Sequence, residues 1–212
     1  MRKFIALIMS LIVIIESVYA TSNDTNYVVY SADFFDEDSS RGFHLAYLFS
    51  HNGYSVNLIP RMYTTIANWN SYLQNGYTAY FSTHGTADSM KIHPDSFSST
   101  SLYFTSADLT SNVDVEFVFL SACYSAAYSS FGENLCENVH LNGATLSMGY
   151  DSEVSVVKTD HFETIFYDKF VDDRMTSAGA ISSAFTTYMT LYGNPSDVSQ
   201  HLKLYGSNVD CF

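Results

Sequence analysis

The feature that most limits how this chain can fold is a regular alternation of short apolar runs and amphipathic segments. The runs with the β-branched and aromatic character of strands are 27–31, 54–59, 77–82, 115–120, 144–150 and 202–205. The segments with helical spacing are 42–51, 64–74, 133–141, 160–171 and 177–191. Strands and helices that alternate through short links are typical of a parallel sheet with right-handed crossovers. The sequence therefore predicts an α/β fold with a mostly parallel sheet.

One segment interrupts this alternation, between residues 88 and 112. The runs Met90–His93 and Ser101–Thr105 flank a turn rich in Pro, Ser and Asp, which predicts a small β-hairpin. The rest of the chain shows no repeat and no low-complexity linker, so a single domain is predicted over residues 21–212.

The first 20 residues read as a secretory signal peptide. Arg2 and Lys3 precede an apolar run from Phe4 to Ile15, and small residues stand where a signal peptidase cleaves, up to Ala20. A membrane anchor is the alternative, but the run is well short of the roughly 20 apolar residues that span a bilayer. We therefore expect an exported protein, extracellular or periplasmic, with no membrane contact after cleavage.

Composition excludes some functions. The formal net charge is −13 and the chain has 9 Lys and Arg residues, which leaves no basic patch for nucleic acid. The histidines other than His84 show no metal-ligand spacing, and there is no Gly-x-Ser-x-Gly motif of a serine hydrolase. No metal or other cofactor is predicted.

Two of the predicted strands end in residues that can perform chemistry. The run 77–82 leads to His84-Gly85, and the run 115–120 leads to Ala122-Cys123. In an open parallel sheet, the carboxyl ends of neighbouring strands line one crevice, so His84 and Cys123 are predicted to lie side by side. An imidazole next to a thiol can activate it as a nucleophile for acyl transfer, most simply peptide hydrolysis. Taken alone, Cys123 could equally be an inert buried thiol.

Gly85 adds a possible oxyanion hole. Without a side chain, its backbone N–H can approach a substrate carbonyl and act together with the N–H of Cys123. Asp88 is close enough in sequence to orient His84, but it could equally be a solvated carboxylate in a loop.

Short motifs along most of the chain accompany the pair. They are His84-Gly85, Phe104–Leu109, Ala122-Cys123, Asn142–Ala144, Met148-Gly149, Phe166–Phe170 and Leu204–Gly206. In this arrangement the chain resembles the caspase-like cysteine peptidases, which include caspases, the gingipain and clostripain types, and CHAT domains. The resemblance implies a three-layer sandwich with helices on both faces of the sheet, a Cys123–His84 dyad and a polypeptide substrate. The chain is not a true caspase, because Ser121-Ala122-Cys123-Tyr124-Ser125 replaces the caspase sequence Gln-Ala-Cys-Arg-Gly.

The resemblance also suggests where substrate would bind. In caspases an arginine after the first strand recognises an acidic side chain, and Arg41 lies in that stretch. Carboxylates outnumber it there, with Asp36 in the acidic segment 33–38, and Asp151 and Glu153 after the fifth strand. This excess predicts cleavage after Lys or Arg. The alternatives are that these charges face solvent or that the acidic segment holds Ca²⁺.

Three cysteines leave one thiol unpaired in an oxidising compartment. A Cys136–Cys211 disulfide would leave Cys123 free, whereas a Cys123–Cys136 bridge would make the site structural. Another class of function also remains open, a catalytically silent caspase-like module that binds a partner.

Overall fold

A six-stranded sheet lies at the centre of the computed structural model, which describes residues 25–30, 36–92 and 102–211, without the side chains of 36–39 and 62. Its strands are β1 (Thr25–Tyr30), β2 (Ser55–Pro60), β3 (Thr78–Ser82), β7 (Phe117–Ser121), β8 (Leu146–Tyr150) and β9 (Leu202–Gly206). They lie in the order β2-β1-β3-β7-β8-β9, and all pairs are parallel except β8–β9. The prediction of a mostly parallel α/β sheet is confirmed.

The two central strands are the most apolar. All five residues of β3 and all five of β7 are buried, as expected for parallel strands that are covered on both faces. They pair directly with each other, which confirms the predicted neighbourhood of the His84 and Cys123 strands.

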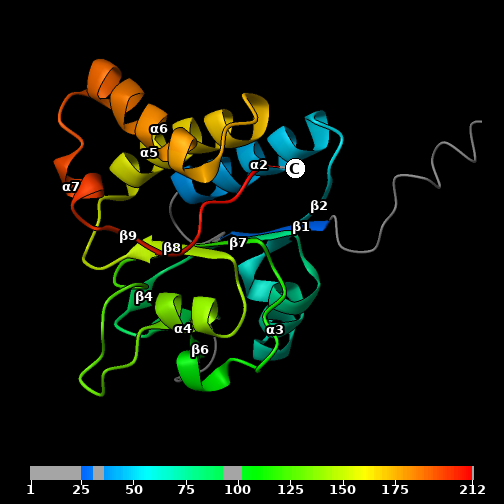
Figure 1. The fold of residues 1–212 in the computed structure, drawn as a ribbon. Coiled ribbons are helices and arrows are strands. Elements are labelled where there is room, and N and C mark those ends of the chain that lie inside the picture. The colour runs from blue at the N-terminus through cyan, green and yellow to red at the C-terminus, as the bar shows by residue number, and fades with distance from the viewer. Residues whose placement is uncertain (1–24, 31–35, 93–101, 212) are drawn as a thin grey trace, which may run out of the picture.

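Helices cover the sheet on both sides (Figure 1). One layer contains α2 (Asp36–His51), α5 (Val156–Tyr167) and α6 (Ser177–Tyr192), and the other contains α3 (Ile66–Asn75) and α4 (Leu135–Leu141). Each layer buries its own apolar core, and Phe49 and Phe166 belong to one while Trp69 and Leu135 belong to the other. This is the predicted three-layer sandwich.

Shorter elements complete the chain. They are η1 (Arg61–Tyr63), η2 (Ser106–Asp108), η3 (Asp168–Asp172) and α7 (Ser196–Ser199). The predicted helix bounds differ most from the structure in α2 and α5. Helix α2 begins at Asp36 rather than residue 42, and α5 begins at Val156 and passes into the π-helical turn η3 at Asp168.

The predicted hairpin is also confirmed, as part of a small second sheet. Strand β5 (Ser89–Lys91) pairs antiparallel with β6 (Tyr103–Thr105) and with β4 (Gly85–Thr86), which the sequence had not suggested. Because β4 begins at Gly85, this small sheet fixes the backbone that directly follows His84.

Candidate active site

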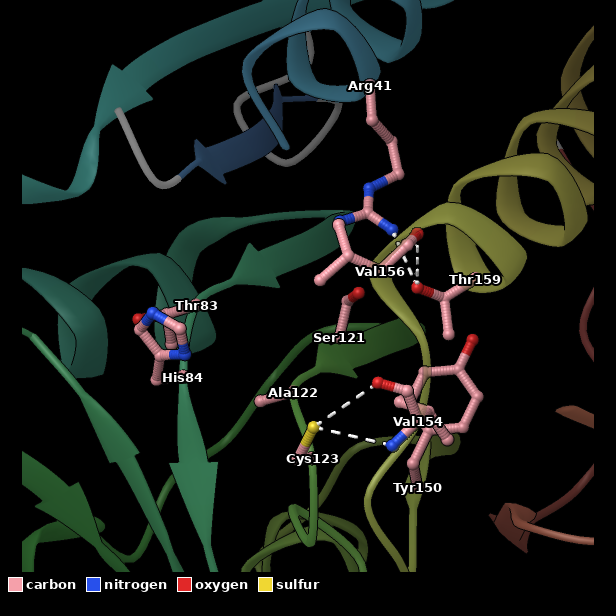
Figure 2. Close-up of a pocket in the computed structure, with 10 residues that line it drawn as sticks. All are labelled: Arg41, Thr83, His84, Ser121, Ala122, Cys123, Tyr150, Val154, Val156 and Thr159. Carbon is pink, nitrogen blue, oxygen red and sulfur yellow. Dashed lines mark hydrogen bonds between the residues drawn. The ribbon is translucent and has the colours of Figure 1, made fainter. Parts of the chain in front are cut away.

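His84 and Cys123 follow two strands that are paired to their last residues. Ser82 at the end of β3 is the register partner of Ser121 at the end of β7. The backbone N–H of Thr83 donates to the carbonyl of Ser121 at 3.2 Å, which extends this pairing past the strands. His84 and Cys123 come next on each chain and line one pocket (Figure 2). The structure thus places His84 and Cys123 on the lining of the same pocket.

The pocket itself is small, with a cavity volume of about 40 Å³. A single water needs roughly 10–15 Å³ on this measure, so the pocket has room for about three. Arg41 enters it from the α2 side and Cys123 from the end of β7, with Ser121 between them (Figure 2). Its size suits a small side chain.

Gly85 lies so close to the nucleophile that no other residue fits there. A Cβ atom at this position would be 2.4 Å from the carbonyl oxygen of Cys123 and 2.9 Å from the Cβ of Ala122. Contacts below about 3.0 Å would require the backbone of one strand end to move. The glycine therefore sets how closely the His84 and Cys123 segments approach each other.

The β4–β5 pairing also sets the direction of the Gly85 N–H. The N–H of Lys91 donates to the carbonyl of His84 at 2.9 Å, and Gly85 pairs with Met90 one residue further on. Hydrogen-bonded and non-hydrogen-bonded pairs alternate along an antiparallel ladder, so Gly85 and Met90 form a non-hydrogen-bonded pair. The Gly85 N–H therefore points away from β5, as an oxyanion donor must.

The sulfur of Cys123 is half-buried and contacts the loop between β8 and α5. The N–H of Val154 donates to Sγ at 3.5 Å, and Sγ is 3.7 Å from the carbonyl oxygen of Val154 (Figure 2). The sulfur thus both donates to and accepts from the backbone of Val154, which holds the Cys123 side chain against this loop.

Tyr124 turns the chain sharply after the nucleophile. Its φ of 60° lies in the left-handed region, which costs a bulky residue roughly 1–2 kcal/mol. Its N–H donates to the carbonyl of Ser152 at 3.1 Å, which holds the turn against the same β8–α5 loop. Strained backbone of this kind is frequent beside reactive groups.

A buried ion pair lies at the far side of the pocket. Nη1 of Arg41 is 3.2 Å from Oε2 of Glu163, and the two side chains are 3% and 0% exposed. Arg41 also donates to the hydroxyls of Thr159 at 3.3 Å and Ser82 at 3.2 Å. The pair thus joins α2 and α5 to the end of β3.

Three hydroxyls complete the surroundings of Glu163. Ser121 and Tyr150 donate to Oε1 at 2.7 and 2.8 Å, and Tyr80 donates to Oε2 at 2.8 Å. Burial raises the pKa of the Glu163 carboxyl above its usual value, against the opposing effect of Arg41 and these hydroxyls. Burial also raises the pKa of both tyrosines well above the usual value, so they remain protonated donors.

The sequence analysis missed Glu163. A signal for it exists, because this carboxylate stands directly after Phe162 and three residues before Phe166 in α5, and both phenylalanines are buried. Its neighbours one turn away, Thr159 and Tyr167, are buried as well, so the spacing places Glu163 on the buried face. What no sequence pattern indicates is that Arg41, 122 residues earlier, provides its counter-charge.

The four predicted substrate-binding residues do not converge. Arg41 lines the pocket, but it is buried and paired with Glu163 rather than free to meet an acidic substrate. Asp151 is 2.8 Å from Nζ of Lys203 and 2.9 Å from Nδ1 of His201 on or beside β9, because opposite charges attract it there. Glu153 is exposed, and Asp36 begins α2 but its side chain is outside those described.

The predicted Cys136–Cys211 disulfide is wrong. All three cysteines are free thiols. Cys136 lies on the buried side of α4, in the core of that layer, while Cys211 belongs to the core on the side of α2 and α6. The sheet separates the two sulfurs. Cys136 instead lies 3.1 Å from the hydroxyl of Ser147, so it is not bridged to Cys123 either.

Asp88 is not placed as an orienting partner for His84. It adopts a left-handed φ of 63° in the β4–β5 turn, and its carboxylate accepts a hydrogen bond from Ser106. Within the part of the chain that the structure describes, no group of three or more His, Cys, Asp or Glu side chains could hold a metal ion. The acidic segment considered for Ca²⁺ has no described side chains.

With the sheet order, the layers and the strand-end pair in view, the fold is that of the caspase-like cysteine peptidases. Crystal structures of gingipain R, an Arg-specific cysteine proteinase, superpose with a TM-score of 0.71 at 11% identity, covering 87% of this chain and 46% of that one. The pro- and mature-domain complex of Porphyromonas gingivalis RgpB gives a TM-score of 0.71 at 13% identity, with 87% and 47% covered. Separase from Saccharomyces cerevisiae, in its complex with securin, gives 0.63 at 14% identity, with 89% and 12% covered.

This chain therefore spans less than half the length of the gingipain chains and a small part of separase. In sequence, it is 31% identical over 133 residues to an uncharacterized protein of Archaeoglobus fulgidus, a match covering 60% of this chain and 66% of that protein. No protein-family model matches the chain. At these identities the structural likeness establishes the fold.

Among the helices that the structure describes, none has the length and apolar character needed to cross a membrane.

Proposed function

We propose that this protein is a cysteine endopeptidase in which Cys123 is the nucleophile and His84 the general acid and base. The observation that carries the proposal is the convergence of both side chains on one pocket from register-matched strands, with Gly85 packed against the Cys123 backbone. The caspase-like fold supports it, since gingipain R, with the same fold, is a cysteine proteinase.

The geometry suits the steps of peptide hydrolysis. The thiolate of Cys123 attacks the scissile carbonyl carbon, and the N–H groups of Gly85 and Cys123 stabilise the oxyanion that forms. His84 then gives its proton to the leaving amine, which breaks the C–N bond and leaves an acyl-enzyme. A water that His84 deprotonates attacks the acyl carbon, which releases the carboxylic acid and restores the thiol.

A second candidate function is a catalytically silent binding module. The hydrogen bonds between Cys123 Sγ and the backbone of Val154 favour it, because a purely structural thiol could make the same contacts. A silent module would leave peptides intact and show no difference between Cys123 and Ala at this position.

The test is hydrolysis of a panel of fluorogenic peptides under reducing conditions. Cys123→Ala should abolish hydrolysis, and His84→Ala should reduce it by roughly 10²–10⁴-fold, the range of general acid–base assistance. The matched controls are Cys136→Ala in the core and His51→Ala at the exposed end of α2, which should keep activity. Wild-type activity in Cys123→Ala would show that the nucleophile is wrongly assigned.

We also propose that the protein is exported, on the basis of residues 1–20, which lie outside the described part of the chain. Mass spectrometry of protein recovered outside the cytoplasm should find a chain that begins after Ala20; an intact N-terminus there would contradict the proposal. Cleavage after Lys or Arg remains a sequence prediction. The described carboxylates Asp151 and Glu153 do not support it, so its remaining basis is Asp36 and the rest of the acidic segment 33–38.

A further inference from the structure

The pocket beside Cys123 ends at the guanidinium of Arg41, whose positive charge is already neutralised by Glu163. Arg41 reaches from α2 toward Ser121 and Thr159 and lines the pocket (Figure 2). Glu163, which is fully buried, pairs with Arg41. The guanidinium and the carboxylate are 3.2 Å apart. Any substrate side chain that entered the pocket from Cys123 would meet this pair.

The hydrogen bonds of Glu163 show that it carries a negative charge. Its Oε1 accepts from Ser121 and Tyr150, and its Oε2 accepts from Tyr80 and is in contact with Arg41. Four donors on its two oxygens, one of them a guanidinium, favour the ionised carboxylate, because each oxygen of the anion can accept two hydrogen bonds. The pair is therefore an anion and a cation, with no net charge.

We propose that Glu163 sets the charge of this pocket by neutralising Arg41, so that the pocket accepts a small uncharged polar side chain rather than an acidic or a basic one. The inference rests on the proposed function, because it takes the pocket to hold the substrate residue whose carbonyl Cys123 attacks.

Electrostatics in a buried site supports this preference. A substrate carboxylate would have to share Arg41 with Glu163, and the two anions would repel each other. A substrate ammonium would meet the guanidinium of Arg41 before it could reach Glu163. Each charged side chain would also lose its hydration without gaining a partner charge, a larger penalty in a poorly hydrated site than in water.

The lining and the volume suit a hydroxyl or a short amide. Ser121 and Thr159 present hydroxyl oxygens in the pocket, whose cavity volume is about 40 Å³. Their hydroxyl hydrogens are already donated to Glu163 and to backbone carbonyls at the start of α5, so a side chain such as that of Ser, Thr or Asn can donate to their oxygens. A neutral side chain avoids both repulsions, so the pocket discriminates against charged side chains in its favour.

The first experiment measures the pocket charge without relying on peptide hydrolysis. Cys123 is alkylated in the full-length protein by iodoacetate, iodoacetamide and 2-bromoethylamine, which are anionic, neutral and cationic, and the rate at Cys123 is followed by peptide mass mapping. In Glu163→Gln, the ratio of iodoacetate to iodoacetamide rates should rise by roughly tenfold over wild type, since an uncompensated Arg41 attracts the anion. The ratio of 2-bromoethylamine to iodoacetamide rates should fall in the same variant, since Arg41 repels the cation. An unchanged ratio would overturn the inference.

Two further variants serve as controls for charge, and circular dichroism checks that each variant is folded. The double variant Arg41→Gln/Glu163→Gln has no charge and should return to the wild-type ratio. Arg41→Gln alone leaves Glu163 without its cation and should shift the ratios in the opposite direction, so it serves as the test if Glu163→Gln does not fold. His84 is present in every variant and influences the alkylation rate in each of them, so its influence cancels when the rate ratios are compared between variants.

The second experiment is a set of peptides that differ only at the residue before the scissile bond. Wild type should cleave after Asn, Ser or Thr at least roughly tenfold faster, in kcat/KM, than after Asp, Lys or Arg, and Glu163→Gln should gain activity toward Asp. Faster cleavage after Lys or Arg would overturn this inference and leave the peptidase function standing. If no peptide is cleaved, the peptidase function fails while the alkylation ratios still decide the charge of the pocket.

Discussion

Gly85 is the residue at which a substitution should disturb the strand ends that carry His84 and Cys123. In Gly85→Ala, the new Cβ would be 2.4 Å from the carbonyl oxygen of Cys123, so the strand ends must separate and the oxyanion donor must move. We expect kcat/KM to fall by about 100-fold or more, the effect of losing one such donor. The measurement is peptide hydrolysis, with circular dichroism to confirm folding.

Gly179→Ala in α6 is the control for this substitution. The nearest atom to a Cβ there is 3.3 Å away, on the side chain of Thr176, and the position is helical. It should keep full activity. If Gly85→Ala hydrolysed peptides as fast as Gly179→Ala, the close approach of the strand ends would have no catalytic role.

The three thiols should differ sharply in reactivity. Burial raises the pKa of Cys136 and of Cys211 to about 12, so both remain protonated at neutral pH, whereas Cys123 is half-buried at the pocket. The thiolate is the reactive form. Mass mapping after brief treatment with iodoacetamide should find Cys123 modified and the other two intact. Faster modification of Cys136 or Cys211, or a disulfide between any two, would contradict the structure.

At the scale of the element, α2 has a different role on each side. Its inner side carries Arg41 into the pocket, and its outer side carries His44, whose Nε2 is 2.9 Å from Oδ1 of Asp168 in η3. Hydrogen bonding to Asp168, together with its charge, raises the pKa of His44 despite partial burial. The contact fixes α2 to the turn that ends α5.

This pKa shift predicts a pH-dependent contribution to stability. A histidine whose pKa is raised by folding stabilises the protein fully below the unfolded pKa of about 6.5, and the contribution is lost as the pH rises through the folded value. His44→Gln should therefore lower the free energy of unfolding at about pH 5.5 and change it little at about pH 8.5. Both side chains are more than a third exposed, so the difference should stay below about 1 kcal/mol.

Urea denaturation at the two pH values provides the measurement. His51→Gln is the matched control, since His51 is exposed on the same helix and stacks on Tyr47. A larger effect of His44→Gln at the higher pH would have the wrong sign for an ion pair with Asp168.

At the scale of the whole molecule, the Arg41–Glu163 pair joins two of the three helices of one layer to the centre of the sheet. It connects α2 and α5 directly, and its hydroxyl partners reach β3, β7 and β8. Removing one partner of a buried ion pair leaves an uncompensated charge, so Arg41→Met should lower the free energy of unfolding by about 3–5 kcal/mol.

The double variant Arg41→Met/Glu163→Met should recover part of this loss, because no isolated charge remains. Lys169→Met is the control, since its pairing with Asp173 is exposed and should matter little. Denaturant unfolding of the four proteins measures the difference. Equal effects of Arg41→Met and Lys169→Met would show that the buried pair does not hold the layers together.

The sequence alone determined the order of strands and helices, the α/β class and the strand-end positions of His84 and Cys123. These follow from local patterns. The apolar runs of β3 and β7 are buried on both faces, and the small residues that follow them end the strands where parallel sheets expose reactive groups. Periodicity and turn residues are encoded within a few neighbouring positions, so they can be read without knowing the fold.

Only the tertiary structure decided which distant charges meet and which do not. The sequence suggested Arg41 as a recognition residue, but in the structure it is paired with Glu163, and Asp151 pairs with Lys203 and His201 instead of lining the pocket. Cys136 and Cys211 appeared to be a pair until the sheet was found between them. The physical reason is common to all three. Charge pairing and disulfide bonding act over a few ångströms in space, and the layer in which each helix packs sets those distances.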